Sequence, residues 1–97
     1  MSIMKTKMSA KFKKDLKRIE SRGGDDCDLL NAFVKRIARG DRLNKRHSNH
    51  RLRGKPYDGF QECHVGNDLL LIYEIYEEQG EMVLFLMRAG THSDLLE

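Results

Sequence analysis

Three histidines, an aspartate and an arginine are the side chains of this sequence best suited to acid-base chemistry on an anion. They are His50, His64, Asp68, Arg88 and His92. An imidazole gains and loses a proton near neutral pH, a carboxylate can hold it in one tautomer, and a guanidinium can neutralise a phosphate. The set therefore fits general acid-base chemistry on an anionic substrate.

Two of these residues flank a predicted turn in the stretch 59–73, next to the most apolar segment of the chain. Gly66 and Asn67 mark the turn, so the imidazole of His64 and the carboxylate of Asp68 should lie close together. On these two residues alone, an ordinary turn with a surface ion pair is the alternative interpretation. His92 follows the last predicted strand and can approach the same turn, but the sequence does not fix whether it reaches His64.

The histidines and cysteines could also have other roles. A zinc site at His50, His64, Asp68 and His92 has suitable ligand types, but the spacing does not match usual zinc motifs. His47 is interpreted as a surface or capping residue. Cys27 and Cys63 are predicted to be reduced thiols that pack as small hydrophobic groups.

Length and composition predict one domain spanning residues 1–97. The chain has 97 residues, of which 39% are hydrophobic, which is enough for one small core. Neither a signal peptide nor an apolar run of the roughly 18 residues needed to cross a membrane is evident. We therefore expect a cytoplasmic protein that does not contact a membrane.

Positive charge is concentrated in the first half of the sequence. Residues 1–55 contain 17 Lys or Arg against 6 Asp or Glu, whereas residues 56–97 contain one Arg against 9 acids. This asymmetry indicates either a polyanionic partner or simply a well-solvated face.

Hydrophobic spacing predicts a strand and two helices in the first 40 residues. The strand is Met4 to Met8; the first helix follows Ser9 and ends at Gly23 and Gly24; the second follows Asp25 and Asp26 and ends at Gly40. The apolar positions of the two helices are Phe12, Leu16 and Ile19, then Leu29, Leu30, Phe33, Val34 and Ile37. These stripes should cover a sheet formed by the C-terminal half.

A long basic loop at residues 41–58 precedes three predicted strands, Phe60 to Val65, Leu69 to Glu77 and Met82 to Arg88, with one helical turn in the tail. The last two strands are apolar on both alternating sets, which is typical of central strands covered on both faces. Tyr73, Met82, Leu84, Phe85 and Leu86 are therefore predicted to be packing residues.

The C-terminal half resembles the YafQ branch of the RelE-like toxins. The motifs are His50-x-Leu-x-Gly54, Gly59-Phe60, Cys63-His64-Val65, Asp68 with Leu71-Ile72-Tyr73, and Arg88-Ala89-Gly90-Thr91-His92. The resemblance covers residues 47–96 closely and the helices only in pattern. It implies an α+β fold of order β-α-α-β-β-β, a helical hairpin on a small mainly antiparallel sheet, which is the order predicted above from the residues.

The same resemblance implies a ribosome-dependent mRNA interferase that needs no metal or other cofactor. His50, His64, Asp68, Arg88 and His92 would be catalytic, with Arg88 on the phosphate, Asp68 orienting an imidazole, and the histidines transferring protons. The predicted RNA contacts are Lys45, Arg46, Arg51, Arg53, Lys55, Leu69 and Leu96. Leu69, Leu96 and Gln61 depart from the family pattern, which has aromatic residues at the first two positions and a basic residue at the third.

The implied partners are mRNA in the ribosomal A site, ribosomal RNA, a cognate antitoxin and, together with that antitoxin, operator DNA. One alternative is a non-catalytic module that binds ribosomes or an antitoxin. Another is a metal-dependent nuclease.

Overall fold

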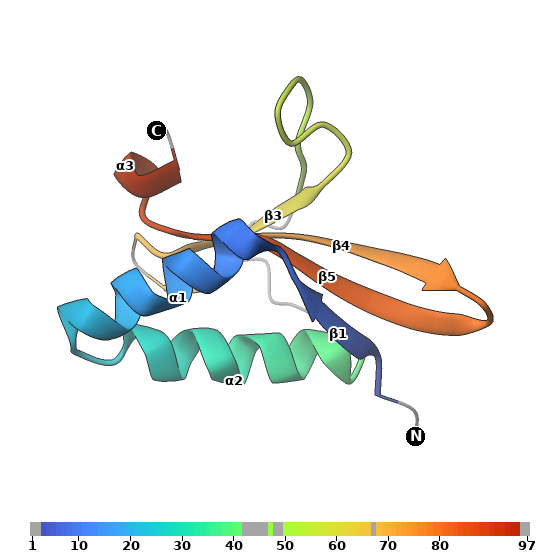
Figure 1. Cartoon of the computed structure of the whole chain (residues 1–97), viewed down its shortest axis with the longest axis horizontal. Coiled ribbons are helices and arrows are strands. Elements are labelled where there is room, and N and C mark those ends of the chain that lie inside the picture. The colour runs from blue at the N-terminus through green and yellow to red at the C-terminus, as the bar shows by residue number, and fades with distance from the viewer. Residues whose placement is uncertain (1–2, 42–46, 48–49, 67, 96–97) are drawn as a thin grey trace.

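The computed structural model of the chain describes residues 3–41, 47, 50–66 and 68–95 (Figure 1). Its elements are β1 (Lys5–Met8), α1 (Ala10–Arg22), α2 (Asp26–Ala38), β2 (His50–Arg51), β3 (Gln61–His64), β4 (Leu70–Glu78), β5 (Glu81–Gly90) and α3 (His92–Leu95). None of the helices in the described part of the chain is long and apolar enough to cross a membrane. The predicted residues Lys45, Arg46, Asn67 and Leu96 lie outside the described ranges.

The five strands form one mixed sheet in the order β1-β5-β4-β3-β2, in which β1 is parallel to β5 and the other neighbours are antiparallel. Helices α1 and α2 lie on one side of the sheet, and α3 and the loop before β3 lie on the other (Figure 1). The predicted α+β fold is confirmed, with β4 and β5 in central positions. Strand β2, which has two residues, lies within the predicted loop 41–58 and was not expected.

The helices begin and end close to their predicted positions. The N–H of Phe12 donates to Ser9 Oγ at 2.9 Å, which caps α1, and Gly23 ends that helix with φ of 73°. Asp25 precedes α2, but its side chain forms no capping hydrogen bond among the described residues. Leu29, placed on the apolar stripe by its spacing, is 46% exposed.

One hydrophobic core lies between the two long helices and the sheet. Its buried members are Phe12, Ile19, Leu30, Phe33, Ile37, Ala38, Cys63, Leu69, Leu71, Tyr73, Leu84, Leu86 and Ala89. Tyr73, Leu84 and Leu86 are therefore core residues as predicted, whereas Met82 is 45% exposed near the distal turn of the β4–β5 hairpin. Cys27 and Cys63 are free thiols, and burial raises the pKa of Cys63 to about 12.

His47 was expected to be a surface or capping residue, but it is buried. Its ring lies edge-on to the ring of Phe33, with the centroids 4.8 Å apart. An aromatic pair of this kind adds to the packing of α2, so His47 has a structural place in the fold.

A bulge in β5 keeps its apolar residues facing the helices. Ile72 pairs with Arg88 and Tyr73 pairs with Leu86, so Met87 is an extra residue between the two pairs. Leu86 and Ala89 are an odd number of positions apart, yet both lie in the core. The bulge therefore also decides that Arg88 lies on the face opposite the helical hairpin.

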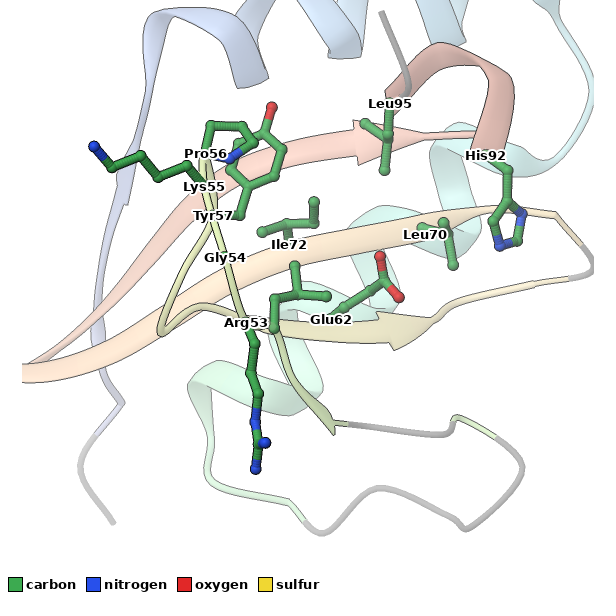
Figure 2. Close-up of a pocket in the computed structure, with 11 residues that line it drawn as sticks. Arg53, Gly54, Lys55, Pro56, Tyr57, Glu62, Leu70, Ile72, His92 and Leu95 are labelled. Carbon is green, nitrogen blue, oxygen red and sulfur yellow. The ribbon is translucent and has the colours of Figure 1, made fainter.

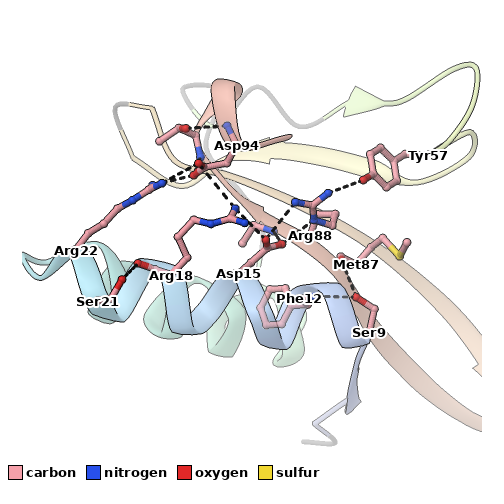
Figure 3. Close-up of polar contacts among 12 residues, drawn as sticks. Ser9, Phe12, Asp15, Arg18, Ser21, Arg22, Tyr57, Met87, Arg88 and Asp94 are labelled. Atoms are coloured by element: carbon pink, nitrogen blue, oxygen red, sulfur yellow. Dashed lines mark hydrogen bonds and ion pairs between the residues drawn. The ribbon is translucent and has the colours of Figure 1, made fainter. Parts of the chain in front are cut away.

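Helix α1 completes the hydrogen bonding of β5 where β1 stops. Met8 is the last residue of β1 to pair with β5, and beyond it Ser9 Oγ donates to Met87 O at 2.6 Å. Asp15 accepts from the backbone N–H of Ala89 at 3.0 Å (Figure 3). The same carboxylate accepts from Arg88, with Nε–Oδ2 and Nη2–Oδ1 distances of 2.8 and 3.2 Å. Asp15 and Arg88 are 2% and 7% exposed, so this is a buried ion pair.

We predict that Asp15→Ala lowers the free energy of unfolding by about 3–5 kcal/mol, because it leaves the Arg88 charge buried without its partner. Urea unfolding monitored by circular dichroism measures the change. Glu20→Ala, at an exposed position of the same helix, is the control. If the two variants were equally stable, the ion pair would not contribute as described.

Candidate active site

The register of the sheet places three of the predicted catalytic residues at one end of it. His64 pairs with Leu70, and Leu70 pairs with Gly90 on its other side. Asp68 precedes Leu70 by two residues and His92 follows Gly90 by two. Residues far apart in the sequence are therefore neighbours here.

Asp68 holds the imidazole of His92. The distance from His92 Nδ1 to Asp68 Oδ1 is 2.6 Å, and the backbone N–H of His92 donates to the same oxygen at 3.3 Å. The hydrogen bond from the His92 side chain lowers the pKa of the Asp68 carboxyl, which therefore stays ionised. With Nδ1 directed to this carboxylate, Nε2 is the ring nitrogen available for proton transfer. The predicted turn suggested a pair between Asp68 and His64, whereas in the structure Asp68 contacts His92.

His64 lies beside this pair. Its ring centroid is 6.0 Å from that of His92, and the rings are tilted by 45°. The Nδ1 atom of His64 is buried and has no hydrogen-bond partner among the described residues. An unsatisfied buried polar atom is uncommon and often belongs to a functional site.

His50 lies beside Glu62, a residue that was not predicted for the site. His50 is opposite Glu62 in the β2–β3 pair, and its Nε2 lies 3.4 Å from Glu62 Oε1. Glu62 shares the lining of one cleft with His92. The structure thus adds a second histidine-carboxylate pair to the same end of the sheet.

This cleft, called here the Tyr57 cleft, has a volume of about 220 Å³. It lies between the loop before β3 and helix α3, over β4 (Figure 2). Its lining residues are Leu52, Arg53, Gly54, Lys55, Pro56, Tyr57, Glu62, Leu70, Ile72, His92 and Leu95. Apolar side chains form most of the interior, while the exposed side chains of Arg53 and Lys55 extend outward from it (Figure 2). Polar groups from His92 and Glu62 complete it.

His64 and Asp68 border a second hollow of about 690 Å³, which also includes Asp26, Leu29, His47 and Thr91. Because His92 borders the first cleft and lies against Asp68, the histidine-aspartate group connects the two hollows. An extended substrate could contact both.

Arg88 lies behind the Tyr57 cleft. Its Nη1 donates to the hydroxyl of Tyr57 at 2.9 Å, while its Nε and Nη2 donate to Asp15 (Figure 3). The hydrogen bonds to Asp15 raise the pKa of Arg88, so the guanidinium is always charged. The predicted direct contact with phosphate conflicts with this arrangement, because the charge is buried and already neutralised by a carboxylate.

The predicted RNA contacts are divided among several environments. Arg53 and Lys55 are exposed at the Tyr57 cleft, and Arg51 is exposed on β2. Leu69 is 3% exposed and belongs to the hydrophobic core, so in this structure its side chain offers almost no surface to RNA. Lys45, Arg46 and Leu96 lie outside the described residues, although Leu95 lines the cleft.

Three contributors to the site were missed: Asp15, Tyr57 and Glu62. A signal existed for Asp15, which occupies an apolar-stripe position between Phe12 and Ile19, where a charge is rare unless it is paired. Tyr57 is an aromatic residue among basic ones. Glu62 alternates with His64 along β3 and therefore points to the same side of the sheet.

Helix α3 is fixed by Asp94, which positions His92. Arg22 donates to both Asp94 oxygens at 2.8 Å, and the N–H of Thr91 donates at 3.0 Å (Figure 3). Gly90 is needed at the start of this turn: it has φ of 153°, and a Cβ there would lie 2.9 Å from Asp94 Cβ. The side chain of His92 is thus tied through α3 to the end of α1.

The described residues contain no group of three or more His, Cys, Asp or Glu side chains arranged to hold a metal ion. Within that part of the chain, the histidines instead contact carboxylates and aromatic rings.

A helical hairpin on a small mixed sheet is the architecture of the YafQ and RelE-like bacterial toxins. The family model described as the bacterial toxin of the type II toxin-antitoxin system, YafQ, matches residues 4–97. The chain therefore belongs to the YafQ family. None of the curated proteins compared with it matches.

Solved structures agree with this assignment. A metal-bound toxin from Helicobacter pylori is 38% identical, with a TM-score of 0.80, and the match covers 96% of this chain and 99% of that one. A conserved hypothetical protein from Helicobacter pylori is 39% identical over the same shares, with a TM-score of 0.70. The toxin of the Escherichia coli DinJ-YafQ complex is 25% identical, with a TM-score of 0.80, over 97% and 98% of the chains.

We predict that Asp94→Asn destabilises the protein at pH 7 and that the difference from wild type shrinks at low pH. The hydrogen bonds from Arg22 depress the pKa of Asp94 in the folded state. Their contribution, about 1.5–3 kcal/mol for a charge-assisted hydrogen bond, is present above the unfolded pKa of about 4. It is lost as the pH falls from there toward the folded pKa.

Thermal unfolding of both proteins from pH 7 to pH 2 measures this effect. Glu77→Gln, at an exposed position of β4, should differ from wild type by an amount that changes little with pH. A constant difference for Asp94→Asn would contradict the role of its ionised form.

Proposed function

We propose that this chain is a ribosome-dependent endoribonuclease toxin that cleaves mRNA in the ribosomal A site by metal-independent general acid-base catalysis. One observation carries the proposal: Asp68 holds His92 with Nε2 available, and His64 lies beside it. The exposed cations Arg53 and Lys55 border the adjoining cleft. Membership of the YafQ toxin family supports the same function.

The reaction requires one group to take the proton of a 2′-hydroxyl and another to protonate the departing 5′-oxygen. The 2′-oxygen attacks phosphorus, the bond to the 5′-oxygen breaks, and a 2′,3′-cyclic phosphate and a 5′-hydroxyl result. His92 and His64 are the proposed proton-transfer pair, with Asp68 orienting His92 and His50 assisting together with Glu62. Arg53 and Lys55 are the exposed cations proposed to offset the charge that develops on the phosphate.

A cognate antitoxin is the proposed regulator. The Escherichia coli relative was solved as a DinJ-YafQ toxin-antitoxin complex. Helix α1 of this chain presents exposed lysines at Lys11, Lys13, Lys14 and Lys17, which suit an acidic partner. We propose that such a partner blocks access to mRNA and ribosomal RNA, and that the complex binds operator DNA.

The Asp15–Arg88 ion pair favours a second candidate, a non-catalytic module that occupies the ribosome or serves only as an antitoxin partner. With Arg88 held by Asp15, the site lacks the arginine expected on the phosphate. This candidate would bind ribosomes without cutting mRNA.

We predict that His92→Ala reduces translation-coupled cleavage of a reporter mRNA by about 10²- to 10⁴-fold, the usual contribution of a general acid or base. Ser93→Ala, at the neighbouring exposed position of α3, is the matched control. His47 is unsuitable as a control, because its burial against Phe33 links it to folding. Equal cleavage by His92→Ala and Ser93→Ala would reject the catalytic assignment. Intact mRNA with wild type, together with ribosome binding, would favour the non-catalytic candidate.

Ribosome binding should weaken as salt increases, because phosphate contacts release counterions. Neutralising both Arg53 and Lys55 to Gln should make the slope of log affinity against log salt shallower by about 1.4–1.8, from 0.7–0.9 per contact. Sedimentation with purified ribosomes at several salt concentrations measures the slope. Lys7→Gln is the control, since Lys7 is paired with Glu78 at 2.8 Å. An unchanged slope in the double variant would remove these two residues from the RNA contact.

A further inference from the structure

The Tyr57 cleft contains more apolar surface than acid-base chemistry requires. Leu52, Tyr57, Leu70, Ile72 and Leu95 all line it. An aromatic ring opposite aliphatic side chains, with cations at the border, suits a flat apolar group attached to an anion.

We propose that the Tyr57 cleft binds one nucleobase of the RNA next to the cleaved phosphate, and that Tyr57 is the ring on which this base stacks. The proposal rests on the nuclease function proposed above and adds the residue that contacts the base.

The ring is held before any substrate arrives. Its hydroxyl accepts from Arg88 Nη1 at 2.9 Å, and Arg88 is in turn fixed by Asp15. The hydroxyl is thus directed toward Arg88, while the ring remains at the cleft (Figures 2 and 3). A stacking group that is already ordered loses little conformational entropy on binding.

The loop that carries Tyr57 is closed by its own hydrogen bonds. The N–H of Gly59 donates to Leu52 O at 3.0 Å, and the N–H of Gly54 donates to Asp58 Oδ1 at 2.8 Å. The N–H of Leu52 donates to Phe60 O at 2.7 Å, which joins the loop to the start of β3. The cleft wall is therefore a fixed platform of the kind that base recognition uses.

Charge decides in favour of a nucleotide over an apolar peptide segment. The exposed side chains of Arg53 and Lys55 extend away from the apolar interior, where the phosphates on either side of an inserted base would lie. His92 lies at the other end of the cleft, against Asp68.

The experiment measures binding of adenosine, guanosine, cytidine and uridine 5′-monophosphates to the full chain by nuclear magnetic resonance titration. Ribose 5-phosphate is the matched ligand without a base. We expect the nucleotides to bind more tightly than ribose 5-phosphate and to shift the signals of Leu52, Tyr57 and Leu95. Tyr57→Leu should weaken nucleotide binding by about 5- to 150-fold, the value of one base-aromatic stack, with little effect on ribose 5-phosphate.

Two further variants make the result specific to the ring. Tyr57→Phe keeps the ring and should keep most of the preference for nucleotides, whereas Tyr76→Leu removes a half-buried tyrosine of β4 that does not line the cleft and should behave as wild type. Equal binding of nucleotides and ribose 5-phosphate by wild type would overturn the proposal. So would a preference that survives in Tyr57→Leu, or one that Tyr57→Phe loses as completely as Tyr57→Leu.

The proposed nuclease function is tested separately from base binding, by the cleavage of mRNA. If the wild-type protein binds the nucleobase but does not cleave mRNA, the proposed nuclease function is rejected and the proposed base binding in the Tyr57 cleft stands. If it cleaves mRNA but shows no preference for nucleotides over ribose 5-phosphate, the base-binding proposal is rejected and the nuclease function stands.

Discussion

The buried ion pair between Asp15 and Arg88 is the interaction on which the rest of the structure depends. A carboxylate removed from water is tolerated only when its hydrogen-bonding capacity is satisfied. Asp15 accepts hydrogen bonds from Arg88 and from the backbone N–H of Ala89. These bonds connect α1 to the part of β5 that does not pair with β1. Arg88 then reaches through to Tyr57, so one charge pair links the helical layer to the wall of the cleft on the other face.

The acid-base residues are brought together mainly by strand pairing. His64, Leu70 and Gly90 lie side by side across three strands, which places Asp68 and His92 at the same end of the sheet. Asp94 and Arg22 then fix the short helix that carries His92. The site therefore combines a rigid strand register with one side-chain tether, and neither element alone determines the position of His92.

Much of the fold follows from patterns visible in the sequence. Apolar residues at helical spacing identified α1 and α2, and two continuous apolar runs identified the central strands β4 and β5. Strand β2 could not be predicted, because two residues carry no periodicity and their pairing is set by the partner strand.

The differences between the expected and the observed arrangement of the site have a common cause. Residue type identified Asp68 as a carboxylate that orients a histidine, but only the register of β4 and β5 showed that the histidine is His92. Arg88 and Leu69 were expected at the substrate because of the family pattern, while their burial depends on α1 and the core.

The bulge at Met87 also affects how the length of such chains can vary. Residues can be added or lost at the Gln79-Gly80 turn without altering the pairing of Ile72 with Arg88, whereas one residue gained or lost between Met87 and Gly90 would move Ala89 out of the core or change the pairing of Gly90 with Leu70. We therefore expect natural length variation in relatives of this chain to be confined to the distal end of the β4–β5 hairpin.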